Sequence, residues 1–313
     1  MKKAKQGAVP VPKKNLWKQI AKHWEFYVLL LPGIILTIIF KYVPMYGVQI
    51  AFRDYNPVGG FFGSPWVGLK WFERFFNNYN SIRMIKNTVL LSLYSILWTF
   101  PIPIILALLI NQVKWKKFQR VSQTILYAPH FISTMILCGM LRIFLSPYGG
   151  LISTIIQAFG GKATNLIDSA TAFRTIYISS SVWQDAGWGT IIYIATLSSV
   201  DASLHEAARV DGATPLQRIF YIDIPELVPV IVIQLIMSFG NLMNVGFEKA
   251  YLLQTSLNKA TSEIIANYVY EQGLLKAMYS FSTAVGLFNT VVNIVLLVVV
   301  NTVCKRLSDV SFI

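Results

Sequence analysis

Charged residues are scarce in this sequence of 313 residues, where Asp, Glu, Lys and Arg together make up 13% of the chain. Soluble proteins carry about 25%, and here 55% of the residues are hydrophobic. Several apolar runs reach roughly 20 residues, the length at which a helix crosses a bilayer. Lipid offers the backbone no hydrogen-bond partners, so each such run must be helical. The sequence therefore predicts an all-α integral membrane protein and excludes a soluble globular fold.

Motifs that mark catalytic sites are also missing. The sequence contains no phosphate-binding G-x-x-x-x-G-K-[ST] loop, no H-E-x-x-H pair and no G-x-S-x-G elbow. Only three histidines are present, with scattered acidic residues. We therefore expect no catalytic residues, no metal site and no cofactor bound by this chain.

Acidic residues are outnumbered by basic ones, and the formal net charge is +13. A nucleic-acid-binding protein gathers its basic residues on one soluble face. Here they lie mostly at the ends of apolar runs, as in a membrane-topology signal, so we expect no nucleic-acid partner. We predict six spans, at 26–46, 87–110, 121–145, 173–199, 220–245 and 283–303.

The distribution of basic residues also predicts the topology. An even number of spans places both termini on one side. If that side is the cytoplasm, the inner segments hold 15 Lys and Arg residues and the outer segments nine, although the outer segments are longer. Positive residues favour the cytoplasmic side, which predicts an N-in/C-in arrangement.

The chain is divided into a basic tail and a membrane domain. Residues 1–25 are predicted to be a cytoplasmic tail, with apolar residues on one face of a helix and lysines opposite, a pattern typical of a helix lying on an anionic leaflet. A disordered basic tail is the alternative. Residues 26–313 are predicted to form the six-helix membrane domain.

The polar segment 201–219 has the pattern of a short helix, a turn and a second helix. Ser203 and Glu206 fit a capping box that starts the first helix. Asp211-Gly212 is predicted to end it, since glycine readily adopts the left-handed conformation. Thr214 starts the second helix, which we expect to continue into the next span, where Pro225 and Pro229 would kink it or reset its hydrogen bonding.

The stretch EAARVDGATPLQRIFYIDIP (206–225) resembles the EAA motif of ABC-importer permeases. Six residues fall at motif positions: Glu206, Ala207, Ala208, Gly212, Ile222 and Pro225. Segments such as LLLPGIILTIIFKYVPMYG (29–47) and WGTIIYIATLSSV (188–200) look like the oligosaccharide-type permeases related to the maltose importer, in particular the subgroup for polysaccharide fragments. The resemblance covers nearly the whole chain.

This resemblance implies a type I ABC importer permease fold and a set of partners. Two cytoplasmic ATPase subunits, which bind ATP and Mg, would dock on EAA helices. A second homologous permease would complete the path, and an extracytoplasmic binding protein would deliver the oligosaccharide. Glu206 would be the anchor that forms an ion pair with the ATPase, and Ala207 and Ala208 would form the contact face. Gly212 would form the turn. Asp211, beside this glycine, and Pro225, at the end of the motif, would also belong to the ATPase-coupling residues. A capping role alone is the alternative for Glu206. The implied location is the bacterial inner (plasma) membrane, as a multi-pass protein.

Polar residues inside the predicted spans are candidates for the transport path, because such residues tend to face a bundle interior or a wet cavity. Amides and hydroxyls beside indole rings suit a sugar. The alternatives are hydrogen bonding between helices and, for the tryptophans, a position in the interface belt. His130, beside Pro129, is interpreted as part of a bend rather than a ligand. The candidates are Trp183, Gln184, Asp185, Trp188, Gln234, Ser238, Asn241 and Asn244.

Three other kinds of function fit the sequence less well than an oligosaccharide permease does. A permease for an amino acid, phosphate or an osmolyte would share the EAA motif, and only the aromatic and amide content of the spans favours sugar. A gated channel would not need a rigid docking helix. A membrane-embedded enzyme would need paired acids, metal ligands or an activated nucleophile inside the spans.

Overall fold

The structure is a computed structural model that describes residues 22–162 and 164–307. These residues are almost entirely helical, with one isolated β-bridge between Arg53 and Trp66. The chain divides into two compact units, Met1–Gln49 and Ile50–Ile313. Most of the helix predicted in the basic tail lies outside the described residues.

The first unit contains one long apolar helical run. It comprises α2 (Trp24–Thr37), the π-helical segment η1 (Ile38–Tyr42) and the beginning of the 3₁₀ segment η2 (Val43–Phe52). No side chain of α2 is buried by the described residues, although nearly all of them are apolar. Lipid solvates such a surface, so the exposure fits the predicted first span.

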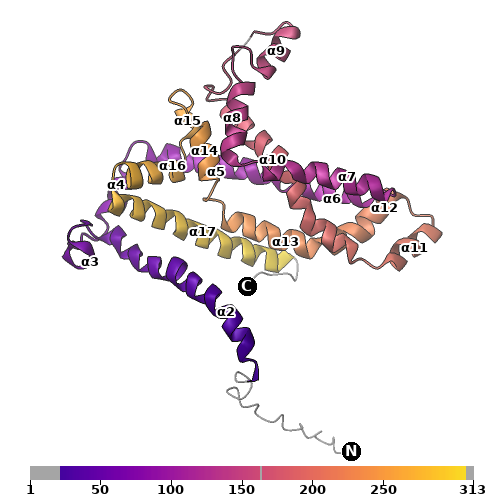
Figure 1. Ribbon diagram of the computed structural model, residues 1–313, viewed down its shortest axis with the longest axis horizontal. Coiled ribbons are helices and arrows are strands. Elements are labelled where there is room, and N and C mark those ends of the chain that lie inside the picture. Colours follow the sequence, from indigo (N-terminus) through magenta and orange to yellow (C-terminus); the bar gives the residue numbers. More distant parts are fainter. Residues whose placement is uncertain (1–21, 163, 308–313) are drawn as a thin grey trace, which may run out of the picture. The chain divides into compact units, whose positions relative to one another are not determined.

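The second unit contains the other helices that the described residues form (Figure 1). Within it, α10 packs along α6 and α5, and α13 packs along α17. In chain order the elements are α3 (Gly60–Gly63), α4 (Lys70–Phe76), α5 (Ser81–Thr99), α6 (Pro101–Asn111), α7 (Lys116–Tyr127), η3 (Ala128–Phe131), α8 (Thr134–Phe144), α9 (Leu151–Ala158), α10 (Phe173–Ser198), α11 (Ala202–Val210), α12 (Pro215–Arg218), η4 (Ile219–Asp223), α13 (Ile224–Gly240), α14 (Phe247–Leu253), α15 (Lys259–Ser262), α16 (Ile265–Tyr270), η5 (Glu271–Leu275) and α17 (Tyr279–Leu307).

Among residues 22–162 and 164–307, four helical runs are long and apolar enough to cross a membrane, and a bent pair would add a fifth. The four are Trp24–Phe52, Ser81–Asn111, Pro215–Gly240 and Tyr279–Arg306. The 26-residue α10 is long enough but is not among them, and its polar residues reduce its apolarity. The all-helical membrane fold is thus confirmed, whereas the number of six spans stays a prediction.

The predicted third span, 121–145, is not one continuous helix. The run Lys116–Phe131 and helix Thr134–Phe144 meet at an angle of 92°. Pro129 explains the break in part, because its ring nitrogen has no hydrogen to donate. Ser133 then starts α8 as its N-cap, accepting the Ile136 amide at 3.4 Å.

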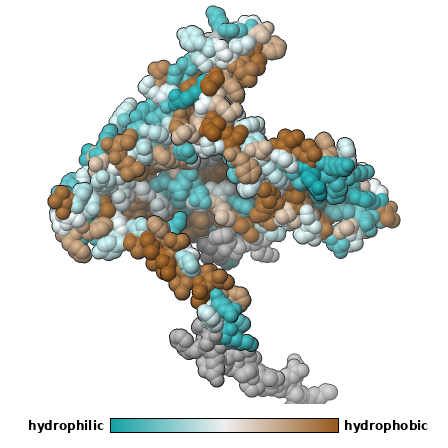
Figure 2. Space-filling model, viewed as in Figure 1, coloured by the Kyte–Doolittle hydropathy of each residue, from teal (hydrophilic) through white to brown (hydrophobic). Residues whose placement is uncertain are grey.

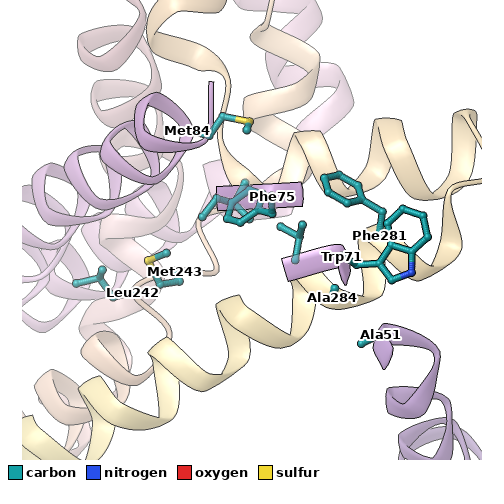
Figure 3. Close-up of a cluster of buried hydrophobic side chains, with 10 residues drawn as sticks. Ala51, Trp71, Phe75, Met84, Leu242, Met243, Phe281 and Ala284 are labelled. Carbon is teal, nitrogen blue, oxygen red and sulfur yellow. The ribbon is translucent and has the colours of Figure 1, made fainter. Parts of the chain in front are cut away.

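The largest buried cluster joins helices from distant parts of the second unit (Figure 3). Trp71 and Phe75 of α4 lie against Phe281 and Ala284 of α17, and Met84 of α5 closes one side. A separate cluster around Leu227 fastens α13 to α6 and α10. These contacts fix the spans that carry the candidate site.

Candidate functional site

Helix α11 begins at a different residue from the one predicted. Asp201 is its N-cap, and its carboxylate accepts the backbone N–H of Ser203 at 2.9 Å. The predicted box between Ser203 and Glu206 is therefore wrong, because Ser203 already lies in the first turn. The hydrogen bond from the Ser203 amide favours the ionised carboxylate and lowers the pKa of Asp201.

The end of α11 and the start of α12 match the sequence prediction. Gly212 has a φ of +78°. Its N–H donates to the Arg209 carbonyl at 3.1 Å and the Ala213 N–H to the Ala208 carbonyl at 2.8 Å, which together form a Schellman motif. Thr214 and Gln217 then form the predicted capping box, with Pro215 at the first position of the helix.

Helix α11 has one face toward the protein and one toward solvent. His205 and Ala208, three residues apart, are half-buried, whereas Glu206 and Ala207 are exposed. Asp211, Gly212 and Pro225 are also exposed. Figure 2 shows hydrophilic surface over the end of the second unit where Figure 1 places α7 and α12. Glu206 borders a polar pocket of about 550 Å³ there, together with Lys114, Lys116, Arg209 and Arg218.

The second helix continues into α13 through a π-helical turn. The Ile224 N–H donates to the Ile219 carbonyl, five residues earlier instead of four. Pro225 follows directly and has no N–H to donate. The predicted reset of hydrogen bonding near Pro225 is thus confirmed, and the chain remains helical from Pro215 to Gly240.

Three of the predicted path residues meet in one pocket. Trp188 of α10 and Gln234 and Ser238 of α13 line a cavity of about 530 Å³, which also borders α5 and α6. Gln234 and Ser238 share a helical face. The Ser238 hydroxyl donates to the backbone carbonyl of Gln234 at 2.8 Å. The Gln234 amide is therefore the freer of the two polar groups. Thr99 and Tyr193 also line this pocket and were not predicted.

Asp185 and Trp188 are held by His130, at the break of the third span. Its Nδ1 lies 2.9 Å from the Asp185 carboxylate. Its ring stacks on Trp188, with centroids 4.4 Å apart and planes 8° apart. His130 thus lies in a bend, as predicted, and also fixes one face of the Trp188 indole. Gln184 is buried and donates to the Ile132 carbonyl at 2.8 Å, which makes it a link between helices.

The other predicted path residues lie outside this pocket. Trp183 is 51% exposed and is not in the pocket lining. Asn241 donates to the Met237 carbonyl at 3.1 Å, and Asn244 accepts from Asn289 at 2.9 Å. Asn289 and Asn293 of α17 were missed, although two amides four residues apart in an apolar run are a readable signal.

A further polar cluster was missed beneath α11. Asp223, at the end of η4, is completely buried, and its carboxylate lies 3.3 Å from His205 Nε2 and accepts from Gln112 at 3.0 Å. An aspartate two residues before Pro225 inside an apolar run was the available signal.

Comparison with known proteins identifies relatives over most of the chain. Residues 79–309 match the family described as "Binding-protein-dependent transport system inner membrane component". The chain is 40% identical to the polygalacturonan/rhamnogalacturonan transport system permease protein YteP of Bacillus subtilis (strain 168), covering 95% of this chain and 92% of YteP. It is 41% identical to protein LplB of the same organism, over 90% of this chain and 88% of LplB.

A solved structure shares the same fold. The crystal structure of a bacterial ABC transporter involved in the import of the acidic polysaccharide alginate contains a chain with 40% identity and a TM-score of 0.86, covering 94% of this chain and 100% of that one. A second structure of the alginate transporter, in complex with an alginate pentasaccharide-bound periplasmic protein, matches equally well, with a TM-score of 0.86 and 95% of this chain covered.

Proposed function

Since this chain belongs to the family of binding-protein-dependent transport system inner membrane components, we propose that it is a permease subunit of an ATP-driven oligosaccharide importer. The observation that carries this proposal is α11, a short helix closed at both ends that presents Glu206 and Ala207 to solvent. A loop that only connects two spans would not need a helix with both ends capped. The helix suits docking of a partner.

Glu206 and Ala207 form the docking face. Glu206 is exposed and makes no ion pair with any residue in the described part of the chain. Its carboxylate is therefore available to a basic residue of an ATPase subunit, where ATP and Mg²⁺ would bind. Ala208, predicted to share this contact face, is half-buried, and its smallness allows α11 to lie close to its own subunit.

The pocket at Trp188 is the best candidate for a saccharide contact. One face of the indole is covered by His130, and the tryptophan also borders the pocket that Gln234 and Thr99 line. A sugar presents C–H groups that stack on an aromatic ring and hydroxyls that bond to amides and hydroxyls. The two relatives that are named for polysaccharide transport support this substrate class.

The remaining partners follow from this role. A second, homologous permease would complete the path, and two ATPases would engage the two coupling helices. A substrate-loaded binding protein would dock on the outer loops, as the alginate transporter complex illustrates for its own periplasmic protein.

Uptake of labelled oligosaccharides by the reconstituted complex tests the proposal. We expect ATP-dependent uptake of fragments of polygalacturonan or alginate, and loss of most uptake in Trp188→Ala. Trp183→Ala removes the same side chain from the same helix outside the pocket, so it should transport normally. Uptake of amino acids or phosphate but of no saccharide would refute the proposed substrate class, and equal effects of the two tryptophan variants would refute the pocket.

A further inference from the structure

Helix α11 is held to its own subunit by very little apolar packing. None of its residues is fully buried, and only His205 and Ala208 are even half-buried. Its covalent connection to α12 passes through Gly212, Ala213 and Thr214. A force applied to the exposed face of α11 could therefore rotate this helix about the turn without moving α13. Efficient transmission of the movement of α11 to α13 therefore needs a contact that bypasses the turn.

A polar contact between His205 and Asp223 bypasses this turn. His205 Nε2 lies 3.3 Å from Oδ1 of Asp223, the last residue of the π-helical segment η4, directly before α13. The contact is not aligned as a hydrogen bond, and Oδ1 has no hydrogen-bond partner in the described part of the chain. His205 is thus the side chain that meets this oxygen, and the contact joins α11 to the helical run of α13.

Asp223 is also fastened on its other side. Its Oδ2 accepts a hydrogen bond from Gln112 at 3.0 Å, at the end of α6. Arg218, five residues earlier on the same helical run, adds positive charge near the carboxylate. The side chain is completely buried, and a buried carboxylate that loses a partner is strongly destabilised. Three elements therefore meet at one carboxylate, and moving α11 or α6 away removes one of its partners.

We propose that His205 and Asp223 form an interlock that makes α11 and the cytoplasmic end of α13 move as one body. The interlock rests on the proposed transport function and adds two positioning residues to it. Asp223 is buried and His205 is half-buried, so the proposal assigns both a positioning role and leaves docking to the exposed Glu206. His205 transfers displacement of the docked helix to Asp223, and Asp223 passes it to α13 and, through Gln112, to α6.

A double-mutant cycle in the full reconstituted complex tests the interlock. The variants are His205→Ala, Asp223→Asn and the pair together, with His23→Ala, an exposed histidine of the first unit, as the matched control. ATP hydrolysis and saccharide uptake are measured on the same vesicles, and co-purification measures assembly. We expect normal assembly, retained ATP hydrolysis, and about tenfold less uptake per ATP in each variant, within the range of typical couplings between sites.

The cycle separates an interlock from a merely structural role. In an interlock the double variant is no worse than either single one, because both remove the same contact. His205→Gln, which retains a donor for Asp223, should recover most of the coupling. Multiplying effects in the double variant, or loss of ATPase association in His205→Ala, would overturn the proposal, the second because it would make His205 a docking residue.

Hydrogen exchange distinguishes failure of the interlock from failure of the proposed function. Amides 204–213, in α11 and the turn that follows it, should exchange at least severalfold faster in His205→Ala and in Asp223→Asn than in the unmodified complex. This readout does not depend on any substrate. If the unmodified complex imports no saccharide, the proposed function fails while faster exchange still supports the interlock. Unchanged exchange in both variants overturns it.

Discussion

Replacement of Gly212 by valine tests whether the turn after α11 depends on backbone conformation alone. Gly212 has a φ of +78°, and a Cβ built at this position would meet no atom within 4 Å. Steric contact with neighbours therefore contributes nothing, and the cost of valine is the left-handed backbone itself. This cost is about 1–2 kcal/mol for an L-residue, and a β-branched side chain is at the unfavourable end.

The cost is large relative to what holds α11 in place. The helix buries no residue fully, so little packing energy opposes relaxation of the strained turn. A penalty of one to two kcal/mol changes a two-state ratio by a factor of about 5–30. We expect the Schellman hydrogen bonds at Gly212 and Ala213 to open in most molecules, while the spans stay folded and inserted.

The assay compares uptake per ATP hydrolysed in vesicles that contain the full complex. Gly212→Val should lower this ratio severalfold or more, whereas Gly212→Asn, which tolerates a positive φ, should retain most of it. Gly286→Val is the matched control, because a Cβ at this α17 glycine also meets no atom within 4 Å but its φ is negative. Normal coupling in Gly212→Val, or equal losses in the valine and asparagine variants, would refute the reasoning.

Three further outcomes are expected. Glu206→Lys places a positive charge where a partner's basic residue would pair, so the ATPase should no longer co-purify with the permease; normal assembly and uptake would contradict the docking role. Gly187→Ala places a Cβ against the Leu126 carbonyl oxygen, which forces α10 and α7 apart at a cost of about 1–3 kcal/mol. Thermal unfolding in detergent should therefore show a lower Tm for Gly187→Ala than for Gly286→Ala, and an equal Tm would be inconsistent with this packing. Single cysteines at 234 and 238 should be protected from a polar thiol reagent by bound saccharide, whereas a cysteine at 241 should not, and equal labelling with and without saccharide would remove these residues from the path.

Local sequence signals predicted the turns of segment 201–219 well. Gly212, Thr214, Pro215 and Gln217 each act through their own backbone or that of a residue three positions away, so their roles can be read from spacing. The error at Ser203 has the same origin. Asp201 and Ser203 are both capable caps, and the glutamate three residues after Ser203 favoured the wrong one. Spacing alone does not decide between two competing caps.

Tertiary contacts could not be predicted in this way. The pairing of His205 with Asp223 joins two helices whose relative position depends on Gly212, and the stacking of His130 on Trp188 depends on the 92° break in the third span. Neither partner is identifiable from periodicity. The candidate path was accordingly predicted by residue type, and the structure brings together Trp188, Gln234 and Ser238 but not Trp183 or Asn241.

The polarity of α10 follows from its position in the second unit. It packs against α5, α6, α7, η3 and α13, so much of its surface faces protein instead of lipid. Such a helix needs less apolar surface than a lipid-facing one, and polar side chains on it can be satisfied by neighbours, as Gln184 is by the Ile132 carbonyl. The same polar residues keep α10 out of the set of helices recognisable as spans, and Trp188 of this helix lines the pocket. A helix that is hard to recognise as a span is therefore the one that carries Trp188, which we propose to contact the saccharide.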